Sequence, residues 1–242
     1  MTETVANTGE RILLEKETPL MIARHFCAYR FAKDYAEKKK VLDIGCGEGY
    51  GTHFLAGFAG DATGIDYSQE VIRYAQIKYI RNNLRFRVLD IRSLASLTER
   101  FNLICSFQVI EHLADPDAFL SSIKGLLAEG GVFICSTPNR LDASPHSKTP
   151  HNKFHIKEYL FPEFRQLLEK HFSIKEMRGL KRGTGLNFYR RLKKIGLFNF
   201  LPDHADPVKR FYSRIDDRHF VVREKGLESA LDFYAVCRKK EI

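Results

Sequence analysis

The sequence predicts an α/β fold with a seven-stranded, mostly parallel sheet and helices on both of its faces. Within residues 39–177, short apolar runs alternate with segments that carry apolar residues at helical spacing. This alternation is typical of βαβ units, which build parallel sheets covered by helices on both sides. A glycine-rich stretch after the first apolar run indicates a ligand-binding loop at the end of a strand. At 242 residues, the chain is long enough to bury a sizeable core.

Seven segments have the length and apolar character of buried strands. They span residues 41–44, 62–66, 85–90, 101–106, 132–136, 172–177 and 229–237. Apolar residues at helical spacing predict helices around and between these strands. The helices are expected at residues 15–38, from Thr52 onward, and at residues 68–79, 117–127 and 158–171. Ser68 is a suitable N-cap for the third of them.

We expect one domain over residues 1–242. It divides into an N-terminal helical segment, a ligand-binding core, a basic insertion, and a last strand with a tail, at residues 1–38, 39–177, 178–228 and 229–242. Glycine, proline and many basic residues interrupt the alternation in the insertion, which is too short and too charged to build its own core. One face of a short helix there could be apolar, with Leu186, Tyr189, Leu192, Ile195 and Phe198. We expect the insertion to cover a substrate site as a lid.

The net charge of +9 is concentrated in the last third of the chain. Residues 165–242 hold 19 Lys and Arg against 10 Asp and Glu, so the preceding residues are neutral on balance. A basic surface of this kind is either simply solvated or attracts an anionic partner. Such a partner could be a phosphate-bearing substrate, a nucleic acid or a membrane surface. The charge alone leaves these possibilities open.

Apolar runs and cysteine usage predict a cytoplasmic protein. The sequence has no run of about 18 apolar residues, so no transmembrane segment is expected. A signal peptide is not expected either, because the N-terminus carries Glu3, Glu10, Arg11 and Glu15. The five cysteines form an odd set without a C-x-x-C pair. They indicate reduced, mostly buried thiols rather than disulfides or a zinc site.

The loop after the first strand reads DIGCGEG, with Gly45, Gly47 and Gly49 at G-x-G-x-G spacing. Glycines there allow positive φ angles and a close approach of backbone amides to a ligand. Asp43 precedes them, and its carboxylate would repel a pyrophosphate but suit a cationic amino group. Asp66 ends the second strand, where an acid can accept hydrogen bonds from a ribose.

A third acid, Asp90, ends the third strand and could accept a hydrogen bond from an exocyclic amine. A ligand with an ammonium group, a ribose and an adenine, but no phosphate, fits this row of acids. S-adenosylmethionine is such a ligand. The alternative is that the glycines only form a tight turn and the acids only cap helices.

Several motifs in order resemble class I S-adenosylmethionine-dependent methyltransferases. VLDIGCGEG (41–49) resembles their first motif, GIDYS (64–68) their second and LDI (89–91) their third. FNLICSFQVIEHL (101–113) and LAEGGVFICSTPN (127–139) resemble the motifs of their fourth and fifth strands. The resemblance covers about residues 20–177 and the last strand. It implies a Rossmann-like fold, S-adenosyl-L-methionine as the cofactor, and a transferase that catalyses methylation.

The resemblance also implies cofactor contacts. Asp43, Gly45, Cys46 and Gly47 would lie near the methionine part, and Asp66 would bind the ribose. Around the adenine, it implies contacts from Tyr67, Asp90 and Ile91, and Gln108 just past the fourth strand is a further implied contact. The segment HFCAYRFA (25–32), which includes Tyr29, is similar to one that precedes the first motif in bacterial members and would close over the cofactor.

Two histidines are candidates for the base that removes a proton from the acceptor. His112 follows the fourth strand in IEHL, and His155 follows the T-P-N turn in HNKFHIKEY. Both fall at the edge of the sheet where the acceptor should enter, and histidine is the usual base near neutral pH. The alternative is that each only orders its loop by hydrogen bonding. His146 and His151 are expected at the surface.

The hypothesis that the protein binds a metal ion depends on a further resemblance. Ubiquinone-pathway and small-RNA 2′-O-methyltransferases carry an E-x-x-E-H motif after the fourth strand that binds a divalent cation. Glu111 and His112 match that motif, but its first Glu is replaced by Gln108. The RNA enzymes add a histidine after a T-P-N turn, and His155 lies at a similar place. An amide carbonyl is a weaker cation ligand than a carboxylate, and the remaining set would favour Mn²⁺, Fe²⁺ or Zn²⁺ over Mg²⁺. We therefore predict no metal.

The T-P-N turn and the segment after it also resemble methyltransferases that act on cell-surface glycans and sugars. The leading hypothesis is O-methylation of a hydroxyl on a small molecule, sugar or glycan. Basic residues of the insertion could meet phosphates of such an acceptor: Arg178, Lys181, Arg182, Arg190, Arg191, Lys193 and Lys194.

Three alternatives stay open. An RNA methyltransferase would explain the basic last third, although no recognised RNA-binding module is visible. A quinone-precursor O-methyltransferase would use residues 186–200 as an apolar lid or a membrane-surface helix. A non-catalytic member of the fold would bind the cofactor without turnover. The oligomeric state stays undetermined.

Overall fold

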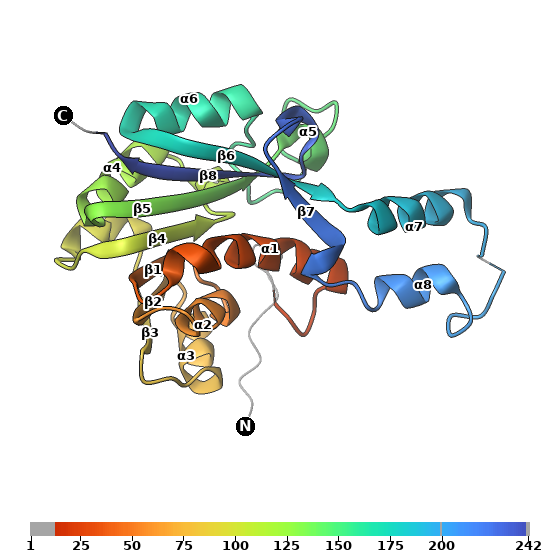
Figure 1. The fold of residues 1–242 in the computed structure, drawn as a ribbon, viewed down its shortest axis with the longest axis horizontal. Helices are drawn as coiled ribbons and strands as arrows, with labels where there is room; N and C mark the ends of the chain where they lie inside the picture. The colour runs from red at the N-terminus through yellow and green to blue at the C-terminus, as the bar shows by residue number, and fades with distance from the viewer. Residues whose placement is uncertain (1–12, 199, 241–242) are drawn as a thin grey trace.

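A computed structural model describes residues 13–198 and 200–240 of the chain (Figure 1). The first twelve residues of the expected N-terminal segment, with Glu3, Glu10 and Arg11, lie outside the described residues, as do residues 241–242 of the expected tail. One sheet of eight strands organises the rest, in the order β3-β2-β1-β4-β5-β8-β6-β7. The strands are β1 (Lys40–Ile44), β2 (Asp61–Asp66), β3 (Leu84–Val88), β4 (Phe101–Phe107), β5 (Leu127–Pro138), β6 (Phe172–Arg182), β7 (Phe220–Arg223) and β8 (Asp232–Lys239).

The sheet is mixed, with a parallel half and an antiparallel half. Strands β1 to β5 are parallel to one another. β8 runs antiparallel to both β5 and β6, and β6 runs antiparallel to β7. The α/β prediction is therefore confirmed, but the prediction of seven strands is wrong.

The additional strand is β7, which lies inside the expected insertion. Its sequence, FVVR, has the β-branched and aromatic residues that suit a strand, but four residues among many charges give too short a signal. β6 also continues past residue 177, because residues 179–182 pair with β7. The folded part of the insertion thus extends the sheet by one strand.

Helices cover both faces of the sheet. The α-helices are α1 (Pro19–Ala36), α2 (Tyr50–Ala56), α3 (Gln69–Lys78), α4 (Pro116–Leu126), α5 (Arg140–Ala143), α6 (Phe161–His171), α7 (Thr184–Ile195) and α8 (Pro207–Tyr212). Short 3-10 helices are η1 (Ile91–Ser96), η2 (Ile110–His112), η3 (Asp217–His219) and η4 (Leu227–Ser229). α1 begins later than expected because the Thr18 side chain caps it and Pro19 occupies its first turn.

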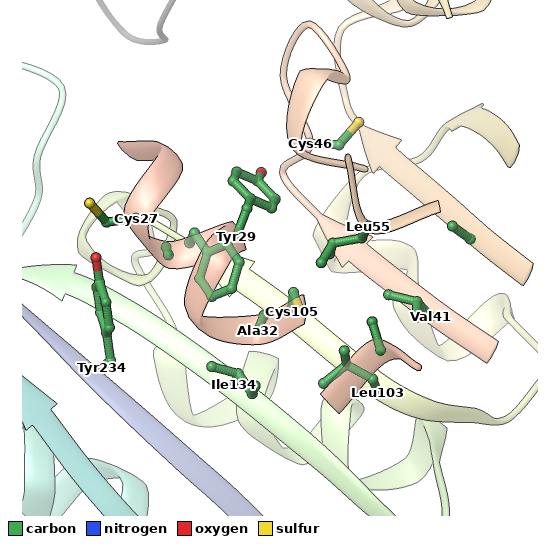
Figure 2. Close-up of a cluster of buried hydrophobic side chains, with 14 of the residues drawn as sticks. Cys27, Tyr29, Ala32, Val41, Cys46, Leu55, Leu103, Cys105, Ile134 and Tyr234 are labelled. Atoms are coloured by element: carbon green, nitrogen blue, oxygen red, sulfur yellow. The ribbon is translucent and has the colours of Figure 1, made fainter. Parts of the chain in front are cut away.

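Two apolar clusters, one on each face of the sheet, form the core. α1, α2 and α3 contribute to the first cluster, and Figure 2 shows Tyr29 and Ala32 of α1 together with Val41 and Leu103 of the sheet. α4 and α6 contribute to the second, which takes up the opposite faces of the same strands, such as Leu42 and Ile104. Apolar residues on both faces explain why β1 and β4 read as continuous apolar runs.

All five cysteines are buried and none is in a disulfide, as the sequence predicts. Among the described residues, no helix is both long and apolar enough to cross a membrane.

Candidate functional site

The site lies where the strand order reverses between β1 and β4. The connections that leave the carboxyl ends of these two neighbouring strands diverge there, which opens a crevice in parallel sheets. The loop of residues 45–49 follows β1, and Gln108 with η2 follows β4. Gln108 has a φ of 55°, an uncommon conformation for a residue with a side chain. Backbone strain of this kind often marks a ligand site.

The glycines of the loop are required by geometry. Gly45 has a φ of 74°, and a Cβ there would lie 2.5 Å from Cγ2 of Val109. The amides of Gly45 and Cys46 both donate to the carbonyl of Ile65 on β2, at 2.8 and 3.0 Å. The amide of Gly47 donates to Oδ2 of Asp66 at 3.2 Å. The loop is thus tied to the end of β2, with its backbone open to a ligand.

A cavity of about 750 Å³ opens beside this loop. Its lining includes seven of the predicted cofactor contacts: Gly45, Gly47, Asp66, Tyr67, Asp90, Ile91 and Gln108. Aliphatic and aromatic side chains such as Val109, Leu113 and Phe119 line it as well. This volume lies within the usual range of cofactor pockets.

The two acids of this cavity that the sequence singled out, Asp66 and Asp90, differ in how their oxygens are used. Asp66 is buried, and its two oxygens each accept one amide hydrogen, from Gly47 and from Ser68 at 3.0 Å. Each oxygen keeps a second lone pair for a ribose hydroxyl. Asp90 instead caps η1, and both of its oxygens accept from the Arg92 guanidinium. An adenine amine at Asp90 would therefore compete with Arg92.

Asp43 lies beneath the loop and lines neither cavity of the site. Its Oδ2 accepts a hydrogen bond from the Thr52 hydroxyl at 2.6 Å, and its Oδ1 is buried without a hydrogen-bond partner among the described residues. Burial raises the pKa of Asp43 to about 7. The structure thus shows an acid that supports the loop from below, and direct contact with the methionine part stays a prediction.

The raised pKa of Asp43 makes the stability of the cofactor-free protein depend on pH. Between pH 4 and 7 the folded state keeps the Asp43 proton and the unfolded chain releases it, so stability falls as pH rises through this window. The Asp43→Asn variant lacks this loss. We expect its free energy of unfolding, relative to wild type, to be higher at pH 8 than at pH 4 by about 4 kcal/mol, measured by urea unfolding. An identical difference at both pH values would contradict the assignment.

A second, smaller cavity of about 270 Å³ adjoins the first. The two share four lining residues: Gly45, Gly47, Gln108 and His112. Tyr29 and Cys46, both predicted contacts, line the smaller one. Tyr29 is buried, and its ring packs edge-on against Phe107 at a centroid distance of 5.0 Å.

The structure also adds residues that the sequence did not single out. Those that line the smaller cavity include Glu17, Met21, Arg24, His25, Tyr50, Phe107 and Asn152. Arg24 and His25 come from α1, where His25 begins the segment of residues 25–32 that was expected to close over the cofactor and Arg24 directly precedes it. The Arg24 guanidinium donates to both oxygens of the buried Asp232, at 2.8 Å each.

The fold brings His112 and His155 together. Their rings meet edge to face with centroids 4.8 Å apart, and both line the smaller cavity. Nδ1 of His112 lies 3.0 Å from the carbonyl oxygen of Phe154. A carbonyl oxygen can only accept, so this nitrogen carries the hydrogen. In the neutral ring, the lone pair of His112 is therefore on Nε2.

Both ring nitrogens of His155 have partners. Nδ1 is 2.8 Å from Oε1 of the buried Glu158, and Nε2 is 3.0 Å from the amide nitrogen of Asn152. The Asn152 oxygen accepts the Phe154 amide at 3.0 Å, which turns its nitrogen toward His155. Neutral His155 therefore donates to Glu158 and accepts from Asn152. His146 and His151 are exposed, as expected.

A possible metal cluster includes both histidines. Glu111, His112 and His155 each place one potential ligand atom within 4.8 Å of the others. However, Nε2 of His155 already accepts from Asn152, and Gln108 replaces the first acid of the motif with its amide nitrogen 3.3 Å from Oγ of Ser136. The side chains of Glu111, His112 and His155 therefore fit a divalent cation incompletely, and the proposed reaction uses no metal ion.

Comparisons with known proteins identify the family. The family model described as "Methyltransferase domain" matches residues 36–182. A probable S-adenosylmethionine-dependent methyltransferase of Mycolicibacterium smegmatis is 35% identical over 74% of this chain and 70% of its own length. This chain belongs to the class I S-adenosylmethionine-dependent methyltransferases. Its cofactor is S-adenosyl-L-methionine.

Further relatives of this methyltransferase match over shorter stretches. A probable S-adenosylmethionine-dependent methyltransferase of Mycobacterium tuberculosis is 31% identical over 66% of this chain, and the match spans 58% of that protein. A ubiquinone biosynthesis O-methyltransferase of Cereibacter sphaeroides is 36% identical over 42% of each chain.

Among solved structures, the N-methyltransferase NodS of Bradyrhizobium japonicum in complex with S-adenosyl-L-homocysteine has a TM-score of 0.61. It is 18% identical, and the match covers 93% of this methyltransferase and 90% of that chain. This similarity supports the fold alone.

Proposed function

We propose that this methyltransferase transfers the cofactor's methyl group to a hydroxyl of a small acceptor, such as a sugar, a glycan end or a phenol. The observation that carries the proposal is the small cavity beside the cofactor cavity, with His112 shared between the two. A volume of about 270 Å³ suits one small ring system rather than a nucleic-acid strand.

The arrangement supports a direct displacement. The acceptor oxygen would attack the methyl carbon in line with the carbon–sulfur bond, which breaks and leaves S-adenosylhomocysteine. The hydroxyl proton would go to Nε2 of His112, whose lone pair is set by the bond from Nδ1 to Phe154. His155, held by Glu158 and Asn152, would position His112 and the acceptor.

The comparisons support an oxygen acceptor to a limited extent. The Cereibacter sphaeroides relative is named as an O-methyltransferase, although the match covers only 42% of each chain. This name favours a phenolic or quinone-precursor ring as a second candidate acceptor. Both candidates use the same cavity and the same base.

A phosphate-bearing acceptor has no support from the basic insertion. None of the seven basic residues expected to meet phosphates lines either cavity. Arg178 pairs with Glu176 and Glu224, and Arg182 pairs with Asp142. We therefore propose an acceptor that is recognised by the cavity itself.

The experiment that tests the proposed function is a panel of acceptors with labelled S-adenosylmethionine. The panel holds monosaccharides, nucleotide sugars, catechols, matched amine analogues and a short RNA. We expect a methyl ether as the product and no methylation of the amines or of the RNA. Methylation of the amines instead, or cofactor binding without turnover on any acceptor, would contradict the proposal.

A further inference from the structure

Residues 184–198 and 200–214 form an arm at the end of the molecule away from β1, β2 and β3 (Figure 1). The arm contains α7 and α8, which lie against each other. The rings of Tyr189 and Phe211 stack at a centroid distance of 3.9 Å, and Leu186 is buried at the base of α7. These contacts use the inner side of α7 and leave its outer side without a partner in the described residues.

The arm exposes four large apolar side chains. Phe188 is 57% exposed, Ile195 69%, Leu197 50% and Phe200 78%. Phe188 and Ile195 are seven residues apart on α7, so they share one face. These four residues are among the eleven large apolar side chains that the described chain exposes, and they lie within 13 positions of one another. Such clustering marks an interaction surface.

The same arm is strongly basic. The arm holds seven Lys and Arg against two Asp. Asp203 pairs with Lys209, and Asp206 caps α8, so neither acid neutralises α7. Within the described chain, no ion pair involves Arg190, Arg191 or Lys194, whereas Arg178 and Arg182 next to the arm are paired.

We propose that this arm docks on the surface of a bilayer rich in anionic lipids. Aromatic and aliphatic side chains on one face of a basic helix are typical of segments that lie in the membrane interface, where cations attract anionic headgroups. The four exposed apolar residues would enter the headgroup region, and the unpaired cations beside them would contact the lipid phosphates. The arm's residues line neither cavity, so docking is independent of the proposed chemistry.

The stacking in the arm favours a membrane over RNA. A single-strand binding surface needs aromatic rings that bases can stack on. Tyr189 and Phe211 stack on each other, and Lys193 places its Nζ 4.9 Å from the Tyr212 ring centroid. The exposed rings, Phe188 and Phe200, are apolar to the tip and suit burial among lipids.

The test is co-sedimentation with vesicles, using the full chain. Vesicles of equal parts phosphatidylglycerol and phosphatidylcholine should bind the protein, and vesicles of pure phosphatidylcholine should bind it weakly. Binding to the anionic vesicles should fall as salt rises. Equal binding to both vesicle types, or no binding at low salt, would overturn the proposal.

Two variants assign the binding to the arm. Arg191→Gln with Lys194→Gln should weaken binding about tenfold or more, and Phe188→Ser with Phe200→Ser should also abolish sedimentation at low protein concentration. Two matched controls change exposed residues elsewhere and should bind as wild type: Lys124→Gln with Lys175→Gln, and Ile77→Ser with Ile80→Ser. Unchanged cofactor affinity shows that the variants are folded.

Two other outcomes would replace the membrane with a different partner. RNA binding without vesicle binding would assign the arm to nucleic acid. Light scattering could instead show a dimer that the Phe188→Ser and Phe200→Ser changes dissociate, without vesicle binding. That result would assign the arm to contact with a second copy of the chain. Either result overturns the proposal.

Discussion

The His112→Ala variant should lose about 10²- to 10⁴-fold in turnover while its cofactor affinity stays close to wild type. The reason is that His112 lines both cavities and, in the proposed reaction, would take the proton of the acceptor hydroxyl. A positioned base contributes a rate factor of this size. The measurements are turnover with labelled cofactor at saturating acceptor and titration of S-adenosylhomocysteine.

Two controls separate a chemical role of His112 from a structural one. His112→Gln keeps a donor toward the Phe154 carbonyl but lacks a basic nitrogen, so it should restore stability without restoring turnover. His151→Ala changes an exposed histidine of the neighbouring loop and should leave turnover unchanged. Near wild-type turnover in His112→Gln would show that this histidine only orders its loop.

The Asp66→Ala variant should bind the cofactor about tenfold to a hundredfold more weakly. Asp66 is buried at the end of β2, lines the larger cavity and holds the Gly47 amide of the glycine loop. If Asp66 binds the ribose as we propose, its loss would remove a charged hydrogen-bond partner, which costs about 1–3 kcal/mol. Titration of S-adenosylmethionine by calorimetry measures the effect directly.

Asp61→Ala is the matched control for Asp66→Ala. Asp61 is the first residue of the same strand, at the end opposite to Asp66, and it pairs with Arg85. The change removes an acid from β2 without touching the cavity, and cofactor affinity should stay at the wild-type value. Equal affinities of a folded Asp66→Ala protein and the Asp61→Ala protein would contradict the placement of the ribose.

The parallel half of the fold could be predicted because its signals are local. Strands such as β1 and β4 are buried on both faces, so they appear as apolar runs, and glycines with a nearby acid mark the loop after β1. β7 was missed because its pairing with β6 joins residues about 40 positions apart. Short antiparallel edge strands gain their stability from such pairing rather than from their own sequence.

The candidate site shows the same division. Gly45, Asp66 and Gln108 were recognisable from position along the chain, because strand ends converge at one edge. Glu158 and Asn152 were not, since their role depends on the ring orientation of His155. The hydrogen bond from Thr52 to the buried Asp43 could not be foreseen either, and contact of Asp43 with the ligand stays a prediction. Side-chain orientation around a loop is not encoded in strand order.

The basic insertion shows the limit of arguing from composition. Its charge suggested phosphate binding, yet Arg178 pairs with Glu176 and Glu224. Arg182 pairs with Asp142 of α5. Only the fold shows which cations lack acidic neighbours. In the described chain, the Lys and Arg residues of α7 form no ion pair, and the same helix exposes large apolar side chains.

A crystal structure with S-adenosylhomocysteine bound tests the central claim most directly. We predict that the adenosine lies in the larger cavity with its ribose hydroxyls on Asp66. The sulfur should lie at the junction of the two cavities and face His112. A cofactor whose ribose lies away from Asp66, or whose sulfur faces away from His112, would contradict the account.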